Sequence, residues 1–126
     1  MTHPLSGTPV AFVYTTDRER ALGFYRDTLG LALHSSDGYG DYLQLGGALL
    51  RLTVIADHMA SPHPVLGWAV QDARATVEAL RDKGVVFAIY DGMGQDALGI
   101  WTSPDGKSKI AFFNDPDGNA LMLNEG

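Results

Sequence analysis

The sequence contains no cysteine in its 126 residues. The chain therefore offers no disulfide, no thiolate nucleophile and no zinc–cysteine site. Its longest apolar runs are far too short to span a bilayer, and the first seven residues lack the basic and apolar regions of a signal peptide. These absences predict a cytoplasmic protein that does not enter a membrane.

Positive charge is also scarce, because 9 Lys and Arg face 15 Asp and Glu and give a net charge of −6. An acidic surface repels phosphate backbones, so nucleic acid is not an expected partner. The 45% apolar and 19% charged content is that of an ordinary globular protein. A chain of this length can bury roughly two-thirds of its unfolded surface, which is enough for one domain or two small half-domains.

What the sequence does contain is an internal repeat. Residues 10–31 read VAFVYTTDRERALGFYRDTLGL, and residues 65–85 read VLGWAVQDARATVEALRDKGV. Each stretch is an apolar strand, then an acidic cap, an amphipathic helix and a glycine. At an offset of 55 residues, Val10 aligns with Val65 and Asp17 aligns with Asp72. The match lies in chemical type more than in identity.

The repeat predicts the bounds of two modules, 1–55 and 65–126, joined by a linker over 56–64. Thr16 and Glu19 fit a capping box at the start of the first helix, and Asp72 is the expected cap of the second. A glycine is expected to stop each helix in the left-handed conformation. Three strand candidates follow each helix: 31–35, 41–45 and 48–55 in the first half, and 85–90, 99–103 with 107–114, and 120–124 in the second.

The helix segment ALGFYRDTLGL and the late turn FFNDPDGNALML, in this order and separation, resemble the vicinal-oxygen-chelate (glyoxalase/bleomycin-resistance/dioxygenase) superfamily. The resemblance implies an α+β fold of two tandem βαβββ modules. Their strands would form a curled mixed-sheet cup, with the helices outside and a ligand cavity inside. It also implies a homodimer, since most relatives cover apolar strand edges by pairing chains. Members include isomerases, dioxygenases and drug-sequestering proteins, so the fold does not decide the reaction.

Metal-dependent members that this chain resembles carry four ligands, and the corresponding positions here are Val10, Arg51, Val65 and Met122. Aligning the glycine turns differently would select Leu50 in place of Arg51. That alternative would point a guanidinium at the helix-packed core, which is costly. Valine has no lone pair, a thioether is a weak ligand, and a guanidinium repels a metal. No metal or other cofactor is therefore expected.

The histidines do not supply another metal site. His3 is expected in the terminus, His34 in a short strand beside a turn, and His58 and His63 in the linker. His63 lies two residues before Val65 and would reach that position only if the strand slipped. No acidic partner accompanies it.

Strand alternation predicts which side chains line the cavity. The expected lining is apolar and aromatic with one cation, which is typical of a small-molecule pocket. For Tyr14 and Trp101, the alternative to a ligand role is packing in the core. For Arg51, the alternative is a simple ion pair with a nearby carboxylate. The predicted ligand-binding residues are Phe12, Tyr14, Arg51, Trp101, Met122 and Asn124.

The most specific of these predictions concerns Arg51. An inward guanidinium needs a partner, because desolvating it alone costs several kcal/mol. No acidic residue lies on an inward strand position, so Arg51 is expected to mark the anionic or carbonyl end of a ligand.

Three functions remain open from the sequence. The leading hypothesis is a metal-free protein that binds a small molecule, aromatic or anionic, in the cup. The rival is a lyase, isomerase or dioxygenase with relocated catalytic groups, using Tyr14 or a histidine as acid–base. The third is a structural or regulatory protein with a vestigial cavity. No catalytic residue is assigned.

Overall fold

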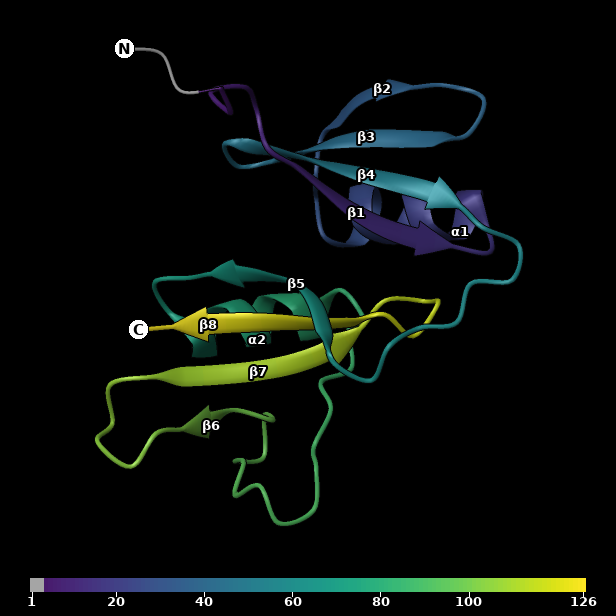
Figure 1. The fold of residues 1–126 in the computed structure, drawn as a ribbon. Helices are drawn as coiled ribbons and strands as arrows, with labels where there is room; N and C mark the ends of the chain where they lie inside the picture. Colours follow the sequence, from purple (N-terminus) through teal and green to yellow (C-terminus); the bar gives the residue numbers. More distant parts are fainter. Residues whose placement is uncertain (1–3) are drawn as a thin grey trace. The chain divides into compact units, whose positions relative to one another are not determined.

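The chain consists of two compact units, one ending at His58 and the other beginning at Met59, as a computed structural model shows (Figure 1). The structure describes residues 4–126, so His3 lies outside the described residues. Each unit is one βαβββ module with a four-stranded mixed sheet. The expected α+β fold of two tandem modules is therefore confirmed. Within residues 4–126, no helix is long and apolar enough to cross a membrane.

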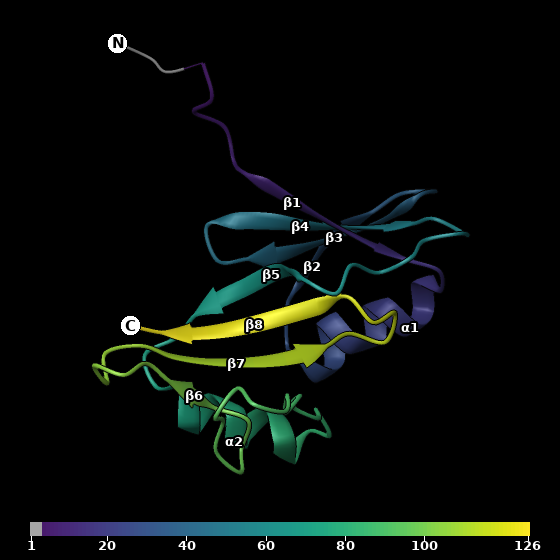
Figure 2. The same cartoon turned by 60° about the horizontal axis from the view of Figure 1, so that its bottom comes forward.

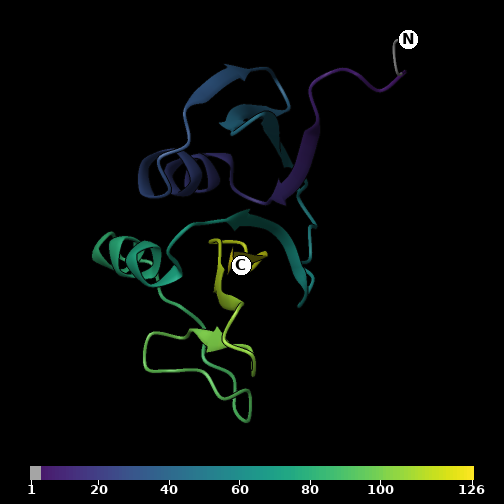
Figure 3. The ribbon, with the colours of Figure 1, turned by 90° about the vertical axis from the view of Figure 1, so that its left-hand side faces the viewer.

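The first unit has its sheet in the order β1-β4-β3-β2, with β1 parallel to β4 and the other pairs antiparallel. The helical segment covers one face of this sheet, and its Tyr25 is fully buried there (Figure 3). The elements are β1 (Val10–Thr15), α1 (Arg18–Leu22), the π-helix η1 (Gly23–Thr28), β2 (Leu33–Ser36), β3 (Gly40–Leu45) and β4 (Ala48–Val54).

The first helix is capped by Asp17, so the prediction of Thr16 as the cap is wrong. The Asp17 side chain accepts a hydrogen bond from the backbone N–H of Arg20 at 3.1 Å. Thr15 explains the difference, because its Oγ1 accepts from the backbone N–H of Asp17 and donates to its carbonyl, both at 3.0 Å. The preceding threonine thus holds the backbone of Asp17 in the extended conformation that a cap needs.

The second unit repeats the arrangement, with the sheet order β5-β8-β7-β6 and β5 parallel to β8. Helix α2 packs on β7 and β8, and Figure 2 shows it against one face of this sheet. Phe113, Leu121 and Leu123 are buried between them. The elements are β5 (Pro64–Ala69), α2 (Ala73–Asp82), β6 (Trp101–Thr102), β7 (Lys109–Asn114) and β8 (Ala120–Glu125).

The strand predicted over 85–90 does not form, and the edge of this sheet is the two-residue β6 instead. Phe87 makes only an isolated bridge to Phe113. The cause is the side chain of Gln95, which accepts from the backbone N–H of Tyr90 at 2.7 Å and donates to the carbonyl of Ala88 at 2.9 Å. The backbone N–H and C=O groups that would pair in a β-ladder are therefore hydrogen-bonded to the side chain of Gln95 instead.

Candidate functional site

In the first unit, the candidate site lies on the face of the sheet that points away from the helix. Along β1 the exposed positions Val10, Phe12 and Tyr14 alternate with Val13, which is buried. Phe12 has 59% of its surface exposed, which is unusual for a large aromatic side chain. The alternation predicted for this strand is the one observed.

Arg51 lies on the same face as Phe12. Its neighbours on β4, Leu50 and Leu52, are buried on the helix side, so alternation turns Arg51 the other way. Arg51 pairs with Phe12 on β1 and with Tyr42 on β3, and side chains of directly paired residues share a face. A row of Phe12, Arg51 and Tyr42 therefore crosses three strands.

Arg51 is only 7% exposed, and its guanidinium contacts both Asp37 and the Tyr42 ring. Its Nη2 donates to Oδ1 of Asp37 at 2.9 Å, and its Cζ lies 4.6 Å from the centre of the Tyr42 ring. Its Nη1 is shielded from solvent and has no hydrogen-bond partner among residues 4–126. A buried donor without an acceptor is costly, typically by about 1–3 kcal/mol, and needs an explanation.

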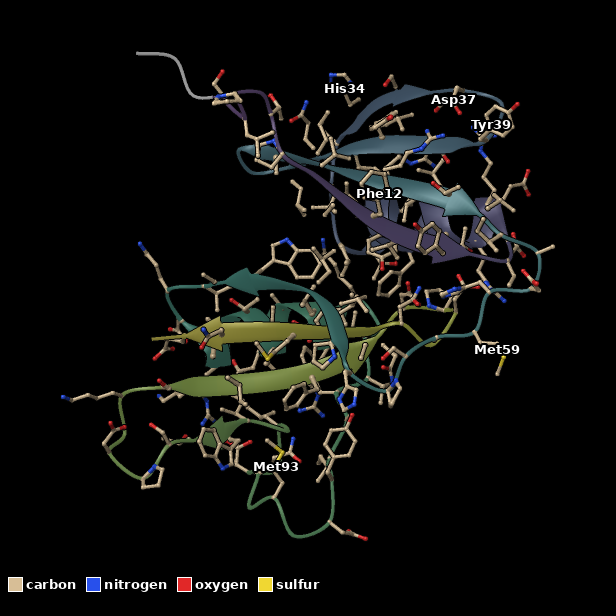
Figure 4. The ribbon with its side chains drawn as sticks, in the orientation of Figure 1. Phe12, His34, Asp37, Tyr39, Met59 and Met93 are labelled. Atoms are coloured by element: carbon tan, nitrogen blue, oxygen red, sulfur yellow. The ribbon has the colours of Figure 1, made fainter. Side chains whose placement is uncertain are left out.

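The ion pair between Arg51 and Asp37 is the alternative that the sequence left open for this arginine. Asp37 belongs to the turn between β2 and β3 and so lies outside the inward strand positions. Figure 4 shows Asp37 and Tyr39 together at the tip of this hairpin. Asp37 Oδ1 also accepts from the backbone N–H groups of Tyr39 at 2.8 Å and Gly40 at 3.1 Å. The hydrogen bond from Arg51, followed by that from Tyr39, lowers the pKa of Asp37 below its usual value.

A second ion pair anchors the same hairpin on the other side of the sheet. Arg18 donates to both carboxylate oxygens of Asp41, at 3.0 and 3.2 Å, and to the carbonyl of Asp37 at 2.7 Å. Burial alone would raise the pKa of Asp41, but hydrogen bonds from Arg18 and Ser36 outweigh it and lower that pKa. The hairpin tip is thus held between two arginines, Arg18 and Arg51.

In the second unit, Met122 and Asn124 lie on the face of β8 opposite to the buried Leu121 and Leu123. Asn124 pairs with Ile110, which in turn pairs with Trp101 on β6. Phe112 pairs with Met122 and stacks edge-on against Tyr90, with ring centres 5.9 Å apart. Trp101, Met122 and Asn124 therefore share one sheet face, as alternation predicted for Met122 and Asn124.

The six predicted residues are divided equally between the two units. Phe12, Tyr14 and Arg51 belong to the first unit, whereas Trp101, Met122 and Asn124 belong to the second. Each group occupies the helix-free face of its own sheet. Two residues on these faces escaped the sequence analysis. Tyr42 could have been found from the hairpin register, but nothing in the sequence pattern singles out the turn residue Asp37.

The register also tests the choice of Arg51 over Leu50 as the equivalent of Met122. Phe12 pairs with Arg51 in the first sheet, and Gly67 pairs with Met122 in the second. Phe12 and Gly67 are related by the 55-residue offset of the repeat, so Arg51 and Met122 are equivalent. Leu50 is fully buried on the helix side.

The side chains at the four family metal positions do not fit a metal ion. Val10 and Val65 offer no donor atom, Met122 offers only a thioether, and the Arg51 guanidinium is already a cation. Among residues 4–126, no group of three or more His, Asp or Glu side chains could hold a metal. His58 instead contacts the Tyr14 ring, with ring centres 5.8 Å apart.

A separate hollow of about 370 Å³ lies in the second unit beside the end of α2. Val85, Phe87, Ile89 and Leu98 contribute apolar walls, and Arg81 contributes its charge. No predicted ligand-binding residue lines it, so it is distinct from the sheet faces.

Comparison with known proteins places this geometry in a family. The sequence matches the Glyoxalase/Bleomycin resistance protein/Dioxygenase superfamily over residues 7–123. A solved glyoxalase/bleomycin resistance protein/dioxygenase from Alicyclobacillus acidocaldarius is 19% identical, with 99% of this chain and 94% of that chain covered and a TM-score of 0.72. A glyoxalase family protein from Enterococcus faecalis is 18% identical, with coverage of 96% and 98% and a TM-score of 0.74.

The lactoylglutathione lyase from Agrobacterium tumefaciens is 20% identical, with coverage of 98% and 96% and a TM-score of 0.69. At these identities the solved structures show a shared fold and nothing about activity. No curated protein matches the chain. The family match covers nearly the whole sequence and agrees with the two βαβββ modules, so the chain belongs to the Glyoxalase/Bleomycin resistance protein/Dioxygenase superfamily.

Proposed function

We propose that this protein binds a small, flat, aromatic molecule through its own side chains, without a metal ion. The observation that carries the proposal is Arg51, a buried cation on an aromatic sheet face with one donor nitrogen left without a partner. A ligand oxygen at Nη1 would satisfy that donor. The aromatic neighbours would then hold the ring of the same ligand.

The exposed aromatic side chains support this assignment. Phe12 is 59% exposed and Tyr14 is 39% exposed on the Arg51 face, and both expose apolar area that folding alone would bury. Ligand pockets combine such apolar walls with a few polar groups that fix orientation. The equivalent face of the second unit carries Trp101, Met122 and Asn124, which are an aromatic, an apolar and a polar side chain.

Substituting Phe12 with alanine tests the proposal. Loss of one aromatic contact, about 0.5–1.5 kcal/mol, is expected to weaken binding of aromatic fragments about fivefold. The free energy of unfolding should hardly change, because Phe12 is mostly exposed. Affinities can be measured by ligand-observed NMR with pairs of fragments that differ only in one group, such as 2-naphthamide and 2-naphthoate.

Val86→Ala is the matched control, since Val86 is 83% exposed and lies outside the predicted site. It should leave fragment affinities at the wild-type level. Equal affinities for wild type and Phe12→Ala, or no fragment binding to the wild type, would overturn the proposed function.

A further inference from the structure

The charges around Arg51 bear on the chemical class of the ligand. Arg51 and Arg18 are balanced by Asp37 and Asp41, one carboxylate for each guanidinium. Both pairs meet at the β2–β3 hairpin, because Arg18 also donates to the carbonyl of Asp37 at 2.7 Å, so the four groups form one neutral cluster. An anionic ligand would add a third negative charge beside two carboxylates, in a protein whose net charge is already −6.

Asp37 is not free to leave when a ligand arrives. Its Oδ1 is held by the backbone N–H groups of Tyr39 and Gly40, and Arg18 donates to its carbonyl at 2.7 Å. The carboxylate therefore stays in place through contacts that do not depend on Arg51. The negative charge of Asp37 therefore remains beside the Arg51 guanidinium when a ligand binds.

The donors that remain on Arg51 suit a single acceptor. Carboxylates bind arginine most strongly through two parallel hydrogen bonds to two nitrogens. Nη2 already donates to Asp37, whereas Nη1 is buried and has no partner in the described part of the chain. One carbonyl or amide oxygen can satisfy Nη1 without bringing charge into the cluster.

We infer that the site selects a neutral carbonyl or amide acceptor on an aromatic ring over the corresponding carboxylate, and that Asp37 determines this selection. The inference rests on the proposed function, since it assigns the ligand class of the same face. Removing the charge of Asp37 should open the site to carboxylates.

The test compares each aromatic amide with its carboxylate, for example 2-naphthamide with 2-naphthoate, on wild type and on Asp37→Asn. The asparagine keeps an oxygen that can accept from the turn N–H groups. Wild type should bind the amide at least fivefold more tightly. Asp37→Asn should shift the amide-to-carboxylate affinity ratio at least tenfold toward the carboxylate.

Asp105→Asn is the matched control. Asp105 holds a turn in the second unit by accepting from the backbone N–H of Lys107 at 3.0 Å and from Ser103 Oγ at 2.6 Å, and no arginine within residues 4–126 pairs with it. The substitution Asp105→Asn removes the same charge and should leave the amide-to-carboxylate affinity ratio unchanged. If Asp37→Asn melts early, Asp37→Ser, which retains a hydroxyl acceptor, replaces it in the same comparison.

Two outcomes separate this inference from the proposed function. Wild type that prefers the carboxylate, or a ratio unchanged in both Asp37 variants, overturns the selection by Asp37 while the binding function stands. Failure of both members of every pair to bind wild type overturns the proposed function, and the inference falls with it.

Discussion

Arg51→Met is expected to lower the affinity for the aromatic amides at least tenfold while leaving the fold intact. A hydrogen bond from a charged donor contributes about 1.5–3 kcal/mol, and its loss corresponds to a tenfold or larger rise in Kd. Methionine is long and apolar enough to fill the space between Phe12 and Tyr42. The variant also loses the buried Nη1 without a partner, so the free energy of unfolding should stay equal or rise.

Arg74→Met provides the control for this substitution. Arg74 pairs with Glu78 on the exposed surface of α2, with an Nε–Oε1 distance of 3.2 Å. Surface ion pairs of this kind contribute little to the free energy of unfolding. Arg74→Met should therefore match the wild type in both ligand affinity and stability. Full amide affinity in Arg51→Met would show that Arg51 is a structural cation neutralised by Asp37. Loss of the fold would show the same.

Arg18→Met is expected to be the most destabilising single charge substitution in the first unit. Asp41 is 2% exposed, and Arg18 supplies its only cationic hydrogen-bond donor among the described residues. Leaving this carboxylate buried with Ser36 as its remaining side-chain partner should cost about 2–3 kcal/mol. Urea unfolding followed by circular dichroism would measure the difference.

The double variant Arg18→Met/Asp41→Leu separates the loss of the ion pair from the cost of the unpaired charge. Removing both partners should recover much of the stability, because an apolar pair leaves no uncompensated charge. A double variant less stable than Arg18→Met would contradict this explanation.

The pH dependence gives a second check on the same pair. The folded state lowers the pKa of Asp41, so its contribution is present above the unfolded value of about 3.9 and is lost as pH falls through the folded pKa. In Arg18→Met the carboxylate loses its cation, and protonation relieves the cost of burying it. The stability difference between wild type and variant should therefore be largest near neutral pH and shrink in acid.

Features decided by neighbouring residues were predictable from the sequence. The alternation of Val10, Phe12 and Tyr14 with Val13 follows from the period of two in a strand. Gly30 and Gly84 adopt φ values of +79° and +95°, the left-handed stops that each helix pattern required. The same alternation set the sides of the sheet on which Arg51 and Met122 lie.

Features that depend on contacts across the fold were not predictable in the same way. Asp37 reaches Arg51 over 14 residues because the pairing of β3 with β4 brings the β2–β3 turn beside β4, and the local sequence pattern does not show that contact. Residues 85–90 have the composition of a strand, yet Gln95 captures their backbone groups. In both places a side-chain contact made 5 to 14 residues away decides the structure, and strand or turn composition alone does not show it.

Binding by the protein after metal removal is the measurement that tests the central claim most directly. Protein dialysed against EDTA, checked for residual metal by mass spectrometry, would be titrated with the tightest amide of the fragment pairs. The titration would be repeated after adding zinc, nickel or manganese. We expect the same Kd within about twofold, since the residues at the family metal positions offer no suitable ligands. Binding that disappears with EDTA and returns with about one equivalent of metal per chain, a stoichiometry typical of a family-type site, would contradict the account.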